Sequence, residues 1–556
     1  MESVHDTRPS RSTFKSVVLV LTCTFAMVVN SANNTSVSIS LSTVGRDLHI
    51  AETQLQWLVS AYPLSSGCLL LVCGRLADLY GRKKIFIVGS VLLSAFTLGC
   101  SFARDSLTLD ILRGFQGIGA AATIPASLGI LAHAFPPSRA RSIAFSTFAA
   151  GAPVGAAFGM ALGGVLTEVT QKSWRSPFFL ETGLTVLCLI GGIISFDPDL
   201  PSQEKDRRVD WPGAFMITAG LVLIVFVLGQ GEIAPHGWKT PYIIALLIVG
   251  VFLVVVFIFW QAHLEKLQVQ REAHKKSYDE NAHMAHSSAP QTTSRLWLSP
   301  PPLMKASLWT RAKGRFAAMM LIAFLEWCAF LAWGFWAQLY YQDYCGYSPL
   351  LTVIRVLPMF VSGVLCNIFV ASVVAYVPIV VLLTVGTLGT SLACLLFAII
   401  NPNATYWAYG FPSAVITVFG ADFVFASGTL FIAKVAEPHE QSLAGALFQT
   451  MTQLGTSLGV TVTTVIFNRV TQQNSRGDPA IIASPPLASY QAAQWGSFAF
   501  GVLSISISIF FFYGVGIVGH NKGPMIENEL DHEHEQGNET AVPSRDQEKN
   551  DEEHPK

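Results

Sequence analysis

Charged residues are scarce in this chain, and their scarcity argues against a soluble protein. Only 13% of the 556 residues are Asp, Glu, Lys or Arg, about half of the share that soluble proteins carry. The two signs nearly cancel to a net charge of −1, so no basic field would attract nucleic acid. We therefore expect no nucleic-acid partner.

Residue constellations that indicate catalysis or metal binding are missing as well. The nine cysteines lie mostly inside apolar runs, and none forms a Cys-x-x-Cys pair or a Cys/His pair at metal-ligand spacing. The sequence also lacks the Gly-x-x-x-x-Gly-Lys-Ser/Thr loop of ATP-binding proteins. We expect neither an enzyme nor a metal or cofactor site, and any energy that this chain uses would have to come from a gradient rather than from ATP.

Long apolar runs dominate what is present. The chain is 51% hydrophobic, and its mean hydropathy is +0.47. Runs near 20 residues, enough to cross a bilayer core of about 30 Å, recur along it. They predict an all-α, polytopic membrane protein with fourteen transmembrane helices near 17–41, 55–74, 84–103, 107–134, 142–167, 176–196, 211–230, 241–262, 316–342, 350–373, 377–400, 404–433, 441–467 and 493–519.

The distribution of Lys and Arg orients these helices. Basic residues concentrate in alternate connections of the first eight helices, and cytoplasmic loops carry such an excess. Both termini are therefore expected in the cytoplasm. The charged stretch 263–280 is expected to be disordered, with a surface helix as the alternative. Asn403 opens an Asn-Ala-Thr sequon in an outside loop and is a candidate glycosylation site.

The clearest local motif lies between the second and third predicted helices. Gly74, Asp78, Gly81 and Arg82 belong to the run Gly-Arg-Leu-Ala-Asp-Leu-Tyr-Gly-Arg-Lys-Lys. The glycines permit a tight hairpin, and Asp78 is expected near the start of the third helix, where the helix dipole favours an anion. A plain topology anchor would explain the basic residues but not the spacing of Gly, Asp and Gly.

This run resembles the signature loop of the major facilitator superfamily, and other segments agree. The resemblance covers roughly 17–262 and 296–519, and it extends to the fourteen-helix drug:proton antiporter branch and its fungal, aminotriazole-resistance-like permeases. The further segments are 112–120 around a buried Arg and the glycines 155, 159, 163 and 164. The short motifs 210–213 and 237–238 resemble the fourteen-helix branch, and the runs 54–62 and 440–445 resemble its fungal members.

The resemblance implies a division of the chain and a mechanism. Two six-helix bundles would flank an inserted helix pair, with the substrate site between the bundles and alternating access by rocking. The implied units are a cytoplasmic tail 1–16, a first bundle 17–196, the inserted pair 197–262, a cytoplasmic loop 263–315, a second bundle 316–519 and a disordered cytoplasmic tail 520–556.

Arg113 is the most costly charge in the predicted spans. A charge deep in a membrane helix normally faces a cavity or a partner. Gln116 and Gly117 share its helix face, and Asp110 lies one turn earlier, where it would neutralise the charge. A structural Arg–Asp pair and the role that the resemblance implies, in coupling proton movement to transport, both stay open.

The predicted fifth helix carries a glycine every four residues. Gly155, Gly159 and Gly163 continue a series that begins at Gly151 and give a smooth face for close packing or sliding of another helix. In the resembled antiporters a proline follows one of these glycines. Met160 takes that place here, so the bend is expected to be weaker or shifted towards Pro153.

Helix 1 departs from the resembled family at its acidic position. Asn33 stands where the family often has an acid, so this position cannot carry a proton. Asn33 and Asn34 belong to a polar stripe that either lines a wet cavity or bonds to a neighbouring helix.

Other acids must carry protons if protons are coupled. The candidates are Glu181, Glu326 and Asp422, besides Asp110, with Arg355 as a possible counter-charge. Arg355 and Gln116 are also candidates for lining the substrate cavity. Desolvation favours the protonated form of such carboxyls, although each is equally well explained by a structural hydrogen bond or ion pair. We expect the charges among the spans to face the space between the two bundles.

Aromatic residues crowd the predicted ninth helix. Trp327 and Trp333 are candidates for an aromatic pocket that would suit a bulky organic substrate. Interface anchoring is the alternative, above all for Tyr340 and Tyr341 at the helix end.

These features predict a secondary transporter. We expect export of a drug-like or secondary-metabolite molecule, with protons as the coupled ion, by a monomer in the plasma membrane. The alternatives are nutrient or vacuolar amino-acid transport, with the vacuolar membrane as location, or a non-transporting sensor.

Overall fold

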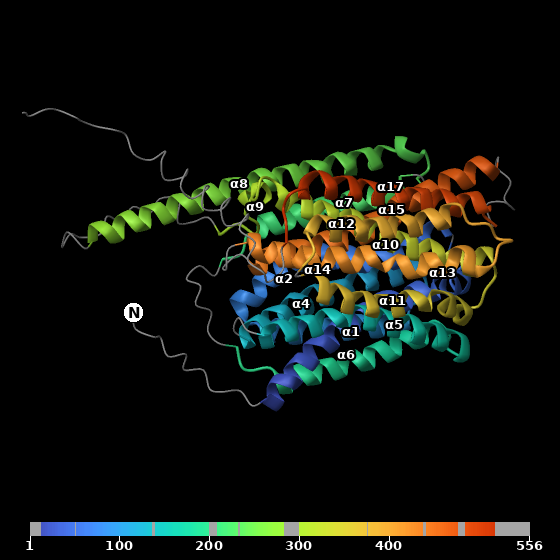
Figure 1. The fold of residues 1–556 in the computed structure, drawn as a ribbon, viewed down its shortest axis with the longest axis horizontal. Helices are drawn as coiled ribbons and strands as arrows, with labels where there is room; N and C mark the ends of the chain where they lie inside the picture. The colour runs from blue at the N-terminus through green and yellow to red at the C-terminus, as the bar shows by residue number, and fades with distance from the viewer. Residues whose placement is uncertain are drawn as a thin grey trace, which may run out of the picture.

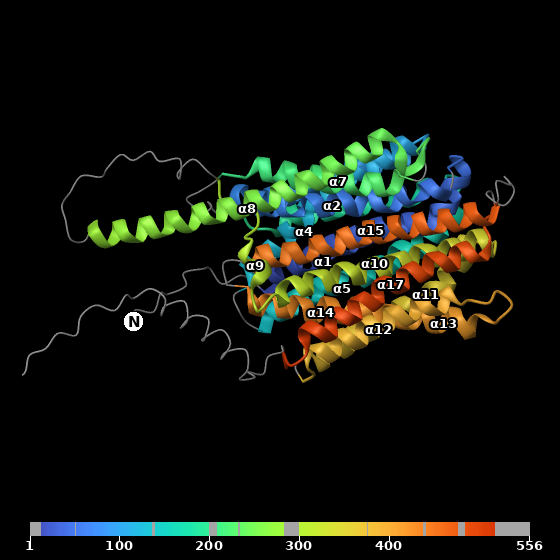
Figure 2. The same cartoon turned by 90° about the horizontal axis from the view of Figure 1, so that it is seen from above.

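The computed structural model describes residues 13–50, 52–135, 139–199, 208–231, 234–282, 300–374, 376–436, 441–475 and 484–517. All regular elements in these ranges are helices, which confirms the predicted all-α class. The long helices run side by side along one direction, as Figures 1 and 2 show from two sides. We call the end at which α1 begins the near end and the opposite end the far end.

The first bundle contains six helices that alternate in direction. They are α1 (Thr13–Asp47), α2 (Glu52–Tyr80), α3 (Arg82–Ser101), α4 (Ser106–Ala134), α5 (Arg139–Val169) and α6 (Arg175–Ser195). α1 packs on α5 and α6, while α3 packs on α4 and α6.

The second bundle repeats this packing. It is built from α10 (Arg315–Leu339) with the π-helical turn η3 (Tyr340–Tyr344), α11 (Pro349–Val373), α12 (Ile379–Ala398), α13 (Tyr406–Ile416), α14 (Val418–Val435), α15 (Gln441–Ser475) and α17 (Leu487–Phe512). α10 packs on α15 and α17, and α12 packs on α14 and α17. The two bundles meet through α2 against α15 and through α5 against α11.

Between the bundles in sequence lie α7 (Trp211–Gln230), η1 (Gly237–Lys239), α8 (Pro241–Ala282) and the short α9 (Ser307–Thr310). Buried Asp210 caps α7 by accepting the Gly213 N–H at 2.9 Å, and it also accepts Nε2 of Gln261 at 2.6 Å. This single carboxylate therefore fastens the start of α7 to α8.

Most predicted helices are found within a few residues of their expected ends, but two differ in kind. α8 continues to Ala282, so the charged stretch expected to be disordered is helical as far as the structure describes it, and it projects beyond the near end (Figure 2). The predicted helix 404–433 is divided at Thr417 into α13 and α14. The expected tail 520–556 lies outside the described residues.

Thirteen helical stretches of the described chain are long and apolar enough to span a membrane, and α13 together with α14 counts as one of them, Tyr406–Ile432. The helix α15, predicted as a further span, is not among them, although it is 35 residues long and packs against α10, α17 and α2. Its Thr, Ser and Gln side chains lower its hydropathy, and many of them are buried. α15 is thus a polar helix placed where protein, not lipid, surrounds it.

Candidate functional site

Arg113 of α4 is completely buried inside the first bundle. Its Nε donates to the Leu58 carbonyl at 3.0 Å, and its Nη1 donates to the Asn33 carbonyl at 3.0 Å and to Oε1 of Gln116 at 2.7 Å. The guanidinium carbon lies 4.8 Å from the centre of the Tyr62 ring. Carbonyl dipoles and a ring face from α1, α2 and α4 therefore stabilise this charge.

Asn33 and Gln116 extend the same network to α3. Gln116 Nε2 donates to Oδ1 of Asn33 and, at 2.8 Å, to Oγ1 of Thr97. Asn33 is fully buried, and its own Nδ2 donates to the Val29 carbonyl at 2.8 Å. Of the two readings of helix 1, the structure thus places Asn33 in contact with neighbouring helices rather than on a cavity wall.

Asp110 lies half-buried one turn before Arg113, but the two do not form an ion pair within 4.0 Å in the described part of the chain. Asp110 Oδ1 has no hydrogen-bond partner among the described residues. The structural Arg–Asp pair considered from the sequence is therefore absent at this distance.

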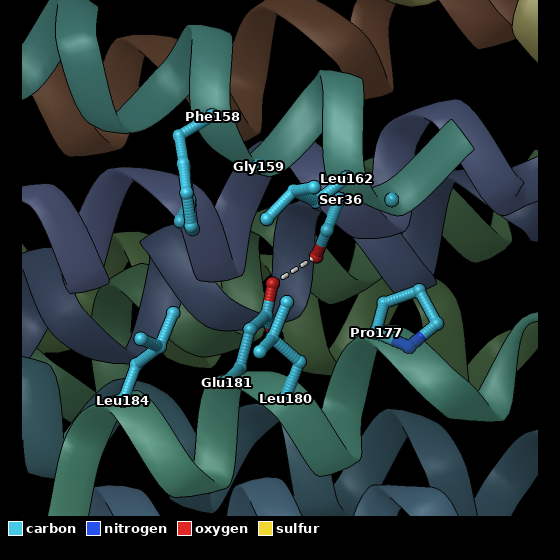
Figure 3. A pocket seen from close by; sticks show the side chains of 10 residues that line it. Ser36, Phe158, Gly159, Leu162, Pro177, Leu180, Glu181 and Leu184 are labelled. Carbon is cyan, nitrogen blue, oxygen red and sulfur yellow. Dashed lines mark hydrogen bonds between the residues drawn. The ribbon is translucent and has the colours of Figure 1, made fainter. Parts of the chain in front are cut away.

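Glu181 of α6 meets α1 at the edge of a small cavity. Ser36 Oγ donates to Glu181 Oε1, as Figure 3 shows, and Oε2 has no partner among the described residues. The cavity of about 10 Å³ lies between α1, α5 and α6 and has room for about one water molecule. Apart from Ser36 and Glu181 its walls are apolar or glycine: Ala32, Phe158, Gly159, Leu162, Gly163, Pro177, Leu180 and Leu184.

Glu326 of α10 is a buried carboxyl group inside the second bundle. It is fully buried, and neither carboxyl oxygen has a hydrogen-bond partner among the described residues. It lies against Gly420 of α14 and beside Thr390 of α12, where a Cβ on Gly420 would overlap the carboxyl group. Thr390 donates its hydroxyl hydrogen to the Thr417 carbonyl at 2.8 Å and not to Glu326.

Asp422 of α14 is half-buried and turned towards α11. Its Oδ2 has no partner among the described residues and would lie 3.7 Å from a Cβ added at Gly363. Arg355 does not act as counter-charge to either acid, because its guanidinium lies at the far end, 4.6 Å from the centre of the Tyr406 ring.

The charged groups thus face the interior of their own bundles. Arg113 contacts only first-bundle helices, while Glu326 and Asp422 contact second-bundle helices. The contacts of Arg113 and Glu326 therefore lie within one bundle each, rather than in the shared space where we expected these charges. Burying a polar group costs less free energy among the carbonyls and hydroxyls of its own bundle than against an apolar neighbour.

Asn34 is the polar candidate that lies closest to the junction of the bundles. It shares a helix face with Val37 and Leu41, which belong to a far-end core built from both bundles. Asn34 Oδ1 has no partner among the described residues.

The two tryptophan candidates are part of the second bundle. Trp333 is 1% exposed, and its Nε1 donates to Oγ of Ser413 at 2.8 Å. Trp327 is partly buried, with its ring 6.1 Å from that of Phe425. Trp333 is therefore a core residue, and only Trp327 keeps an exposed part.

Glycines allow α1 and α5 to touch backbone to backbone. A Cβ at Gly155 or Gly159 would overlap the backbone of Val28 or Ala32, and one at Gly163 would lie 2.9 Å from the Ser36 Cα. Gly455 and Gly459 of α15 make the same contact with α10. Sequence reasoning missed this second pair, although its four-residue spacing was available as a signal.

At the far end, hydrogen bonds cross from one bundle to the other. Ser42 Oγ donates to Asp343 Oδ2 at 2.9 Å, and Gln342 Nε2 donates to the Ile39 carbonyl at 2.9 Å. The Leu350 N–H donates to Glu168 Oε2 at 3.0 Å. No sequence motif pointed to these residues, because each pair is far apart in the chain.

At the near end, the hairpin between α2 and α3 has a different cap from the one predicted. Asp78 lies in the last turn of α2 and binds Arg82 at 2.9 Å. The start of α3 is instead held by Asp199, which accepts the Lys83 N–H at 2.8 Å and the Lys84 N–H at 3.1 Å. Gly81 has a φ of 114° and leaves no space for a Cβ beside Asp199.

Arg82 links this hairpin to the fourth helix. Its Nη1 donates to the Gly129 carbonyl at 2.9 Å. Gly74 lies within contact distance of Pro125 of α4. The motif therefore joins α2, α3 and α4 at the near end, and Asp199 adds the segment after α6.

Known proteins resemble this chain over most of its length. A family model described as Major Facilitator Superfamily matches residues 23–210 and 213–460. The chain is 25% identical to the low affinity ammonium transporter of Saccharomyces cerevisiae, with 91% of this chain and 90% of that protein covered. It is also 25% identical to the aminotriazole resistance protein of the same yeast, with 88% and 83% covered.

A solved structure supports the fold. The model matches a POT family transporter in complex with 5-aminolevulinic acid with a TM-score of 0.56 at 13% identity, covering 91% of this chain and 97% of that one. At this identity the likeness concerns the fold alone. The chain folds into two similarly packed helical bundles, and the family model matches most of its length. The chain is therefore a multi-pass membrane transporter that belongs to the major facilitator superfamily.

Proposed function

We propose that the protein exports a small organic molecule in exchange for protons, by alternating access. The observation that carries the proton coupling is Glu326, which is fully buried without a hydrogen-bond partner for either oxygen among the described residues. An ionised carboxylate in such a place is very costly, whereas the protonated acid is not. Glu326 is therefore suited to take up a proton in one state of the carrier and release it in another.

Glu181 and Asp422 are weaker candidates for the coupled proton. Glu181 accepts a hydrogen bond from Ser36, which supports the charged form as well. Asp422 is only half-buried. Arg113 is saturated on three of its donors within the first bundle, so we assign it to holding α1, α2 and α4 together.

Alternating access is supported by the unequal packing of the two ends. At the far end one apolar core includes Val37 and Leu41 of the first bundle and Val353 and Phe360 of the second. At the near end the core around Leu19 and Phe148 draws its described residues from the first bundle alone. A carrier closed at the far end and separable at the near end is one of the two states that alternating access requires.

The substrate class rests on the relatives. One is named for aminotriazole resistance and another for low-affinity ammonium transport. We favour a drug-like organic compound, because partly exposed Trp327 lies beside Phe425 and supplies an aromatic surface. The plasma membrane is the proposed location, with the vacuolar membrane as the alternative, and Asn403, exposed at the far end, is the proposed glycan site.

Transport by purified protein in proteoliposomes tests this proposal. Aminotriazole and ammonium are the first probes, each measured with and without an imposed pH gradient. We expect gradient-driven movement of aminotriazole, and we expect E326Q to abolish it while leaving substrate binding in place. Asp105→Asn is the matched control, since Asp105 caps α4 in an exposed loop and Asn also caps. Full gradient-driven transport by E326Q would contradict the assignment, and indifference of the wild type to the gradient would remove proton coupling altogether.

A further inference from the structure

A second cavity, with more polar walls than the first, lies at the far end, entirely within the second bundle. Its volume is about 50 Å³, several times the space that one water molecule needs. The walls come from the end of α10 with η3, from α11, from the connection after α12 and from the start of α13. The tyrosines among them are Tyr340, Tyr341, Tyr347, Tyr406 and Tyr409.

Arg355 is the charged residue of this cavity. Its guanidinium carbon lies 5.1 Å from the centre of the Tyr347 ring and 4.6 Å from that of Tyr406. Tyr406 also donates its hydroxyl hydrogen to the Arg355 carbonyl at 2.7 Å. These contacts fix the side chain between two rings while they use none of its N–H donors for a hydrogen bond.

The charge of Arg355 is not compensated within the described chain. No acidic residue is among the described residues that line the cavity, and no described carboxylate lies within ion-pair distance of Arg355. A half-buried guanidinium without an anion is costly. Its planar donor fork matches the two oxygens of a carboxylate, and tyrosine hydroxyls supply further donors.

From this geometry we infer that the far-end cavity binds a small monocarboxylate, about the size of acetate, on Arg355. The carboxylate replaces the missing counter-charge, and the tyrosine rings enclose the short apolar part. Chloride has the matching charge, but a single ion cannot accept from the two parallel N–H donors of the guanidinium as two carboxylate oxygens do. A doubly charged anion such as phosphate carries more negative charge than the single positive charge of Arg355 can balance. This proposal is independent of the proposed proton coupling, because the carboxylate binds to Arg355 at equilibrium and needs no pH gradient.

Thermal unfolding of the purified protein in detergent tests the inference. Sodium acetate, sodium chloride and sodium phosphate are titrated at equal ionic strength. We expect a saturable rise of the midpoint with acetate alone, and R355Q weakens the apparent acetate affinity at least about tenfold, as expected for the loss of a charge-assisted hydrogen-bond pair. Arg104→Gln, which removes an exposed arginine of a far-end loop, is the control and keeps the wild-type response.

Photolabelling of the wild type keeps the test independent of the folding of a variant. A short-chain carboxylate that carries a diazirine is expected to label the peptides around 340–355 and 401–410, and acetate should compete. Labelling elsewhere, equal midpoint shifts by chloride and acetate, or an R355Q response equal to that of the wild type would each overturn the carboxylate site.

Discussion

The hydrogen-bond partner of a single residue decides how the near-end hairpin is held. Asp199 accepts two backbone N–H groups at the start of α3, while Asp78 at the end of α2 pairs with Arg82, the first residue of α3. The sequence motif contains Asp78 but not Asp199, which lies 116 residues from its partner Lys83. Local spacing therefore predicted an acid at the hairpin correctly but chose the wrong acid for the cap.

Replacing Asp199 tests this assignment. Asp199→Ala removes the cap of α3 and is expected to lower stability by about 1 kcal/mol, the usual cost of losing an N-terminal cap. Asp199→Asn keeps one acceptor oxygen and is expected to cost less. The unfolding midpoint in detergent measures both.

Asp78→Ala is the comparison for these variants. It breaks the Asp78–Arg82 pair, which is partly exposed, and pairs of that kind contribute little. A larger loss of stability in Asp78→Ala than in Asp199→Ala would mean that Asp78, and not Asp199, caps α3.

At the scale of whole helices, α1 and α5 are held at a distance that only glycine permits. The repeat of Gly155, Gly159 and Gly163 predicted a smooth face, and each of these residues does lie against α1. The repeat could be read from the sequence because its period equals the helical turn, whereas its partner on α1 has no comparable pattern.

Gly155→Val is expected to force the two helices apart. The new side chain would overlap the backbone of Val28, and overpacking of this kind costs about 1–3 kcal/mol. The yield of monodisperse protein and its unfolding midpoint should both fall.

Gly183→Val in α6 is the matched control for Gly155→Val. No atom outside its own surroundings lies within 4 Å of a Cβ at Gly183, so only helix propensity changes. Equal behaviour of the two variants would mean that the α1–α5 contact can relax without loss.

The positions of most helices followed from apolar run length, but their interruptions did not. α13 ends at Ile416 and α14 begins at Val418, and the Thr417 carbonyl between them accepts the Thr390 hydroxyl hydrogen of α12 at 2.8 Å, a contact that no local pattern predicts. The continuation of α8 past residue 263 was only the alternative to disorder, because a charged stretch carries no apolar period. The long helix before it supplies the nucleus.

At the scale of the molecule, the far end is closed by contacts between the two bundles. Ser42 and Asp343 come from α1 and η3, and Glu168 of α5 holds the start of α11. Such pairings depend on how two bundles meet, so no property of the sequence near either residue predicts them. The two bundles themselves were predictable, because the helix count and the family motifs imply them.

A cross-link at this closure should stop transport. In a double variant S42C with D343C, the new thiols lie where the two oxygens are now 2.9 Å apart, and a short bifunctional thiol reagent should join them. We expect transport in proteoliposomes to cease after linking and to return when a cleavable reagent is reduced.

The single variants S42C and D343C, treated in the same way, are the controls for the native cysteines, of which all but Cys345 are buried. Unchanged transport by the linked double variant would mean that the far end does not open during the cycle.

The inserted pair α7–α8 is attached to both halves of the carrier. α7 bonds to the first bundle, where Gln56 Nε2 reaches the Gly229 carbonyl at 3.4 Å, while Met216 and Phe257 of the pair pack into the near-end core of the second bundle. Glu265 of α8 also holds the Ser307 N–H just before α10. When one bundle rotates against the other, the pair α7–α8 must either move with one bundle or lose its contacts to the other. The pair therefore limits how far the carrier can open.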